Sequence, residues 1–107
     1  MGKNRHAERV SLRTEVALEE PGRQVFLPSL NLSSSGIFLS SEQPPEVGTE
    51  VRVVLSLPPD GMFLRLSGVV VRLADGSEPD GFAVAFEAPE SRTHGVLADF
   101  VRSSRTS

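Results

Sequence analysis

Closely spaced turn residues divide this chain into short apolar runs, and no other feature constrains its fold as strongly. The 107 residues include nine glycines and eight prolines, most of which stand between the runs. Within the runs, apolar and polar side chains alternate, which is the period of a β-strand with one buried face. The alternation predicts six strands, over residues 10–18, 24–31, 36–40, 51–57, 62–73 and 82–86.

Two of these strands contain an irregular residue. Pro28 lies inside the second strand and cannot donate a ladder hydrogen bond, so we expect an edge position or a bulge there. In the run 62–73 the apolar parity changes beside Gly68, which predicts a bulge or a sharp bend at that glycine.

After Pro89 the apolar period changes from that of a strand to that of a helix. Val96, Leu97, Phe100 and Val101 recur at helical spacing. A helix this short is not stable alone, so its apolar side must cover the barrel or meet a partner. The pattern predicts a mainly β fold, a small six-stranded antiparallel (split) β-barrel with one C-terminal α-helix.

The length of the chain allows one domain. We expect that domain to span residues 10–102. Residues 1–9 are expected to form a flexible N-terminal arginine segment, and residues 103–107 a frayed tail.

Charge is unevenly distributed along the chain. The net charge is −3, but residues 1–14 carry four cations and one acid, a local charge of +3, so the remainder carries −6. Ten of the eleven cations are arginines, which contact phosphates and guanine edges in a bidentate way. The negative charge of residues 15–107 disfavours binding to nucleic acid, whereas the basic segment 1–14 suits a small anionic ligand.

Several classes of function are excluded by what the sequence lacks. It contains no cysteine and two isolated histidines, so we expect no metal site. Sequence motifs of metalloproteases, serine hydrolases, P-loop and dinucleotide-binding enzymes are absent, and we do not expect an enzyme. No apolar run approaches the ~20 residues of a membrane span, and residues 1–14 do not resemble a signal peptide. We therefore expect a cytoplasmic protein without membrane insertion.

Two polar motifs carry the functional prediction. Arg5, Arg9 and Arg13 are spaced by four and form two overlapping RxxxR patterns. Residues 31–36 read Asn-Leu-Ser-Ser-Ser-Gly between two predicted strands. Taken singly, the first is typical of a solvated surface and the second of a serine-rich turn closed by glycine.

Together, the two motifs resemble the pattern of PilZ domains, an RxxxR followed some twenty residues later by [DN]xSxxG. The similarity covers most of the chain and extends to three further stretches: residues 36–39, 47–49 and 81–86. PilZ domains are receptors for the bacterial second messenger cyclic di-GMP. Their fold is a six-stranded barrel with a C-terminal helix, the same fold that the alternation predicts.

The resemblance implies a ligand-binding set for cyclic di-GMP. Its members are Arg5, Arg9, Asn31, Ser33 and Gly36. The arginines would neutralise the phosphates and contact or stack on the guanines. The Asn31 amide would face a guanine edge, and the Ser33 hydroxyl would donate to phosphate or base. Gly36 would allow a close backbone approach or a positive φ.

Three further residues are candidate contacts. The family places the second arginine directly before the first strand, which selects Arg5 and Arg9 over the register with Arg13. His6 could stack on or hydrogen-bond to the ligand. Asn4 occupies a position where many relatives carry another arginine linked to binding two ligand molecules, so one or two ligands per chain remain open.

The expected function is that of a receptor without a second domain. Cyclic di-GMP would order the N-terminal segment, and the new surface would act on an unidentified regulated protein. The alternative is a PilZ-like protein–protein adaptor that does not bind nucleotide. A nucleic-acid-binding barrel is disfavoured because the chain has no tyrosine or tryptophan to stack on bases.

Overall fold

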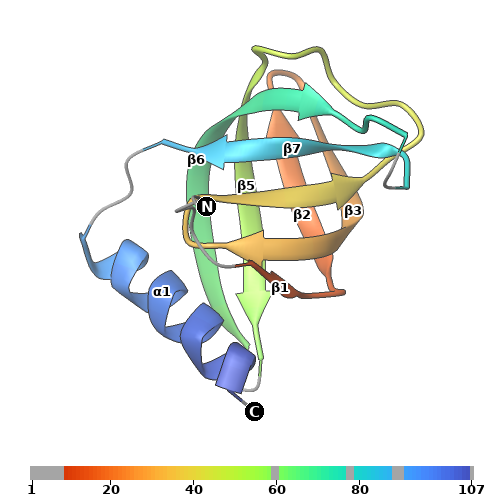
Figure 1. Cartoon of the computed structure of the whole chain (residues 1–107). Coiled ribbons are helices and arrows are strands. Elements are labelled where there is room, and N and C mark those ends of the chain that lie inside the picture. The colour runs from red at the N-terminus through yellow and green to blue at the C-terminus, as the bar shows by residue number, and fades with distance from the viewer. Residues whose placement is uncertain (1–8, 59–60, 77–78, 88–90, 107) are drawn as a thin grey trace.

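The computed structural model describes residues 9–58, 61–76, 79–87 and 91–106, which form seven strands and one helix (Figure 1). The elements are β1 (Arg9–Ser11), β2 (Glu15–Glu20), β3 (Arg23–Ser33), β4 (Gly36–Ser40), β5 (Glu50–Leu57), β6 (Met62–Leu73), β7 (Gly81–Phe86) and α1 (Ser91–Thr106). Apart from the first, each predicted strand agrees closely with an observed one.

Six of the strands form a closed barrel. Their order is β3-β2-β5-β6-β7-β4, and β4 returns to pair with β3. All pairings are antiparallel, and β1 lies outside this ring, against the C-terminal end of β3. The structure thus confirms the expected mainly β fold, a six-stranded antiparallel barrel with a C-terminal helix.

Alternating apolar side chains fill the interior of the barrel. Val16 and Leu18 of β2, Val53 of β5 and Phe82 of β7 have no exposed surface. Full burial of such side chains contributes roughly 1.5–3 kcal/mol each, so the alternation also holds the ring closed.

The predicted first strand, residues 10–18, is interrupted in the structure. β1 ends at Ser11, which pairs with Asn31, and β2 begins at Glu15, which pairs with Pro28. Between these two pairs, the first run advances by four residues, from 11 to 15, whereas β3 covers only three, from 31 to 28. This mismatch separates the run into two ladders.

The side chain of Ser29 fills the gap between these ladders. It is fully buried, and its hydroxyl accepts the Thr14 N–H at 3.2 Å and donates to the Leu12 carbonyl. The backbone N–H of Ser29 donates to the Thr14 carbonyl at 2.8 Å. Backbone groups that the interruption leaves without ladder partners are satisfied in this way.

A second irregularity of β3 is a bulge, which was predicted at Pro28 but lies two residues further on, since Pro28 itself pairs with Glu15. The pairing of β3 with β4 shifts register between Ser29 and Asn31, which makes Leu30 the extra residue of a bulge. Ser29 precedes the bulge and is buried, whereas Asn31 follows it and is half-buried on the outer face of the barrel.

The bulge predicted at Gly68 is wrong in position. Alternate residues of β6 from Leu64 to Val70 are all buried, so the parity of the strand does not change at the glycine. Gly68 is required for another reason, because a Cβ there would stand 2.7 Å from the Ala85 carbonyl oxygen of β7.

The bulge of β6 instead lies between Val70 and Arg72. Val70 pairs with Val84 and Arg72 pairs with Ala83, so Val71 is the extra residue. Val70 is 1% exposed and faces the core. Before the bulge, the even-numbered residues of β6 from 64 to 70 face inward. After the bulge this order is reversed, so Arg72 lies on the outer face.

Helix α1 lies across one end of the barrel and packs against β1 and β3 (Figure 1). Leu97 and Val101 are buried at this contact, and Val96 and Phe100 pack around them. The helix continues to Thr106 and so includes most of the residues expected to form a frayed tail. In the described ranges, no helix combines the length and the apolar character that a membrane span needs.

Candidate ligand-binding groove

The polar motif at residues 31–36 lies on a groove in the outer face of the barrel. The groove has a volume of about 140 Å³ and is lined by strands β3, β4, β6 and β7. Its polar lining consists of Asn31, Ser33, Ser35 and Arg72, with Gly36 and Phe38 beside them. We call this surface the outer groove.

Strand register sets the order of side chains across the outer groove. Asn31 of β3 pairs with Phe38 of β4, Phe38 pairs with Ala83 of β7, and Ala83 pairs with Arg72 of β6. Adjacent strands lie about 4.8 Å apart, so these four residues form one row across the sheet. The small Ala83 leaves room between the larger side chains.

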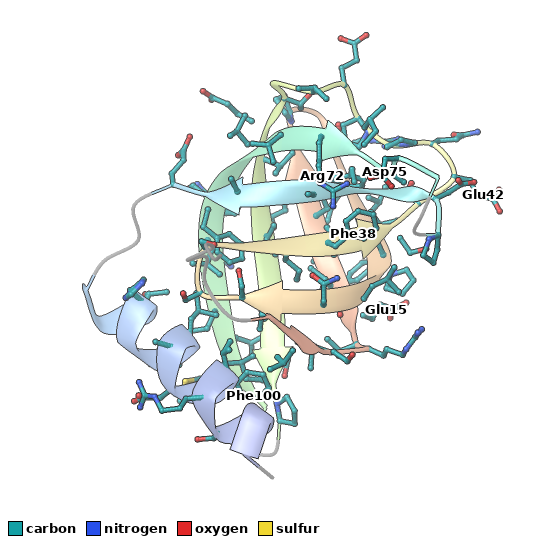
Figure 2. All side chains as sticks on the ribbon, in the orientation of Figure 1. Glu15, Phe38, Glu42, Arg72, Asp75 and Phe100 are labelled. Carbon is teal, nitrogen blue, oxygen red and sulfur yellow. The ribbon has the colours of Figure 1, made fainter. Side chains whose placement is uncertain are left out.

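Phe38 lies on this outer face and is nevertheless only 1% exposed. The Arg72 guanidinium carbon lies 5.5 Å from the centre of the Phe38 ring, in the range of a cation–π contact. Figure 2 shows the two side chains together on the outer side of the sheet. Arg72 was not predicted as a site residue, although a single arginine in the apolar run 69–73 is a signal that could have indicated it.

Ser33 shapes the turn that leads from β3 into β4. Its hydroxyl oxygen accepts the backbone N–H groups of Ser35 and Gly36, both at 3.1 Å, and lies 3.2 Å from the Ser35 hydroxyl. Ser33 is 5% exposed, whereas Ser35 is exposed at the edge of the groove. The geometry supports a structural role for Ser33, and its direct contact with a ligand stays a prediction.

Gly36 has the close backbone approach that was one of its two predicted roles. A Cβ at this position would stand 2.5 Å from the Val84 carbonyl oxygen of β7. Its φ is not positive, since the positive-φ glycines of the described residues are Gly22, Gly48, Gly61 and Gly76. The glycine thus lets the turn approach β7, where the Phe86 N–H donates to the Ser35 carbonyl at 2.9 Å.

The arginine motif reaches the same region through its second member. Arg9 begins β1 and pairs with Ser33, so the chain enters the barrel directly beside the residues 31–36. Asn4, Arg5 and His6 lie outside the described residues. Arg13 is exposed between β1 and β2, and in the part of the chain described here it does not line the outer groove.

A larger hollow, about 310 Å³, lies elsewhere on the barrel. Its charged lining consists of four glutamates and one arginine: Glu19, Glu20, Glu50, Glu87 and Arg52. Its acidic lining disfavours an anionic ligand despite its larger volume. Among the described residues no group of three or more metal-ligating side chains is arranged so that it could hold a metal ion, there or elsewhere.

Comparison with known folds and families agrees with this architecture. The chain resembles a solved structure of the Bacillus subtilis inhibitor of motility (MotI/DgrA), with a TM-score of 0.81 and 16% identity over 99% of this chain. That match covers 52% of the other protein, so this chain spans about half of its length. It also resembles the PilZ domain of CeSA from a cellulose-synthesizing bacterium, with a TM-score of 0.69, 16% identity and coverage of 92% and 99% of the two chains. No curated protein matches the sequence.

These features define a small antiparallel β-barrel with a C-terminal helix and a polar motif on its outer face. The model of the PilZ domain matches residues 3–103, nearly the whole chain. The chain belongs to the PilZ domain family.

Proposed function

We propose that this protein is a cytoplasmic receptor for cyclic di-GMP that regulates a partner protein and has no enzymatic activity. One observation carries the proposal: Asn31, Ser33 and Gly36 meet on the outer groove at the point where Arg9 begins β1. The described residues of the proposed ligand-binding set therefore lie close together in space.

The chemistry of the groove suits one part of a cyclic dinucleotide. About 140 Å³ is smaller than the roughly 300–1,000 Å³ of pockets that enclose a drug-sized ligand. We therefore infer that one base occupies the groove, with its edge toward the Asn31 amide, while Arg5 and Arg9 bind the phosphates.

The position of β1 suggests how binding would reach a partner. β1 lies outside the closed barrel and contacts both β3 and α1. A ligand that holds Arg5 and Arg9 would order the N-terminal segment against β1 and create a composite surface with the helix. Such a ligand-dependent change in order is a recognised type of switch.

Calorimetric titration with cyclic di-GMP tests the receptor function, with cyclic di-AMP and GTP as control ligands. Saturable and selective binding is the expected result, and its stoichiometry gives the number of ligands per chain. A flat titration together with a captured protein partner would instead support the adaptor function.

The arginine assignment needs its own variants. Arg9→Ala should weaken binding by roughly 2–5 kcal/mol because a charge-assisted contact to phosphate is lost. Arg65→Ala is the matched control, since Arg65 is exposed on β6 and pairs with Val54, outside the groove lining. Binding that survives both Arg5→Ala and Arg9→Ala would refute the assignment.

A further inference from the structure

Two β-bulges flank the outer groove on opposite sides. In β3 the extra residue is Leu30, directly before Asn31, and in β6 it is Val71, directly before Arg72. Before each bulge a buried residue faces inward, and after it a polar side chain faces the groove. If each strand kept its regular alternation without a bulge, Asn31 and Arg72 would face the apolar core.

Arg72 is held in a defined position on the groove. Its guanidinium carbon lies 5.5 Å from the centre of the Phe38 ring, and its Nη1 donates to the Leu73 carbonyl at 3.3 Å. To reach Phe38, the side chain passes across the strand that carries Ala83, since the three residues lie in one row. A larger side chain at position 83 would obstruct this path.

The lining around Arg72 suits a base better than a phosphate. Val71, Ala83 and Ala85 supply apolar surface, and the guanidinium carbon lies over the ring of the buried Phe38. A guanidinium held over an aromatic ring can in turn stack on a planar base.

We propose that Arg72, held over the Phe38 ring, is a nucleobase-binding platform of the outer groove. One guanine of cyclic di-GMP stacks on the guanidinium, and its edge faces Asn31 on the opposite side of the groove. This inference rests on the proposed function and adds to the RxxxR and Asn-Ser-Gly motifs a ligand-binding residue from β6.

Parallel calorimetric titrations of four proteins with cyclic di-GMP test the platform: the wild type, Arg72→Ala, Arg72→Lys and Arg65→Ala. Loss of one stacked base should weaken the affinity of Arg72→Ala by about 10- to 100-fold. Arg72→Lys should weaken binding nearly as much, because an ammonium group has no planar face to stack on a base. Arg65→Ala should bind within about threefold of the wild type.

The outcomes separate this inference from the proposed function. A wild-type protein that does not bind overturns the function and the platform together. If the wild type binds and Arg72→Ala binds equally well, only the platform is overturned. Wild-type affinity in Arg72→Lys would show that charge alone acts there and would also overturn it.

A second measurement places the base in the groove. A stacked base should shift the Ala83 methyl resonance through its ring current when ligand is added to the folded wild-type protein. The shift should be lost in Arg72→Ala, whose thermal unfolding provides the check that it remains folded. An unchanged Ala83 resonance in saturated wild-type protein would contradict the platform.

Discussion

Ser29 shows how much one buried hydroxyl contributes to this fold. It satisfies backbone groups on both sides of the interruption between β1 and β2, namely the Thr14 N–H and the Leu12 carbonyl. Without that hydroxyl the two groups would be buried beside an apolar methyl group.

Ser29→Ala should therefore destabilise the protein by about 1–3 kcal/mol, the usual cost of buried backbone groups without partners. Urea unfolding followed by circular dichroism measures the difference. Ser67→Ala is the control because Ser67 is exposed on β6, and its removal should change the free energy of unfolding by less than about 0.5 kcal/mol. Equal stability of the two variants would contradict the role given to Ser29.

Gly36 has a role in packing that its sequence motif alone does not reveal. Gly36→Ala would place a Cβ 2.5 Å from the Val84 carbonyl oxygen, so β4 and β7 would have to separate. We expect a loss of about 1–3 kcal/mol in the free energy of unfolding, as for other overpacked positions. The melting temperature measures it, and an unchanged value would show that the turn adjusts without cost.

Asn31 and Arg72 mark the limit of what alternation can predict. The motif at residues 31–36 identified Asn31 from its neighbours in sequence, without any knowledge of the bulge at Leu30. Arg72 has no such motif, and its place on the outer groove results from the bulge at Val71. The position of a bulge depends on how two strands pair, so the apolar parity of the run 62–73 indicated a bulge but placed it at Gly68 instead of Val71.

Strands and helix were predictable where one face of the element is buried. The runs 36–40 and 62–73 agree with β4 and β6 in both bounds, because turn residues end them sharply. Residues 10–18 show the opposite case. Their apolar parity is unbroken across the interruption, since Val10, Leu12, Val16 and Leu18 are all buried. The interruption is therefore visible only in the pairing with β3.

Helix α1 contains a residue that weakens it without serving its packing. A Cβ built at Gly95 meets no atom within 4 Å, so the glycine is not required by a neighbour. Gly95→Ala should stabilise the protein by about 0.5–1 kcal/mol through helix propensity alone. Thermal unfolding measures the gain, and Gly36→Ala is the matched substitution, which we expect to act in the opposite direction. A less stable Gly95→Ala variant would indicate an unrecognised contact of the helix.

Closure of the barrel links the candidate site to the rest of the protein. β3 pairs with β1, β2 and β4, so the strand that carries Asn31 and Ser33 joins the outer strand to the ring. α1 packs on β1 and β3, with Leu97 fully buried. We therefore expect the barrel and the helix to unfold together as one cooperative unit.

Ligand binding should stabilise that whole unit. Cyclic di-GMP at 100 times its dissociation constant should add about 2.7 kcal/mol to the free energy of unfolding. For a domain of this size, that corresponds to a rise of roughly 10–20 °C in the melting temperature. The helical and strand signals of circular dichroism should shift by the same amount, because α1 rests on the strands that border the site. Arg72→Ala, at the same ligand concentration, should show a smaller shift. A strand transition that moves while the helical one stays would refute the cooperative unit and separate α1 from the response to ligand.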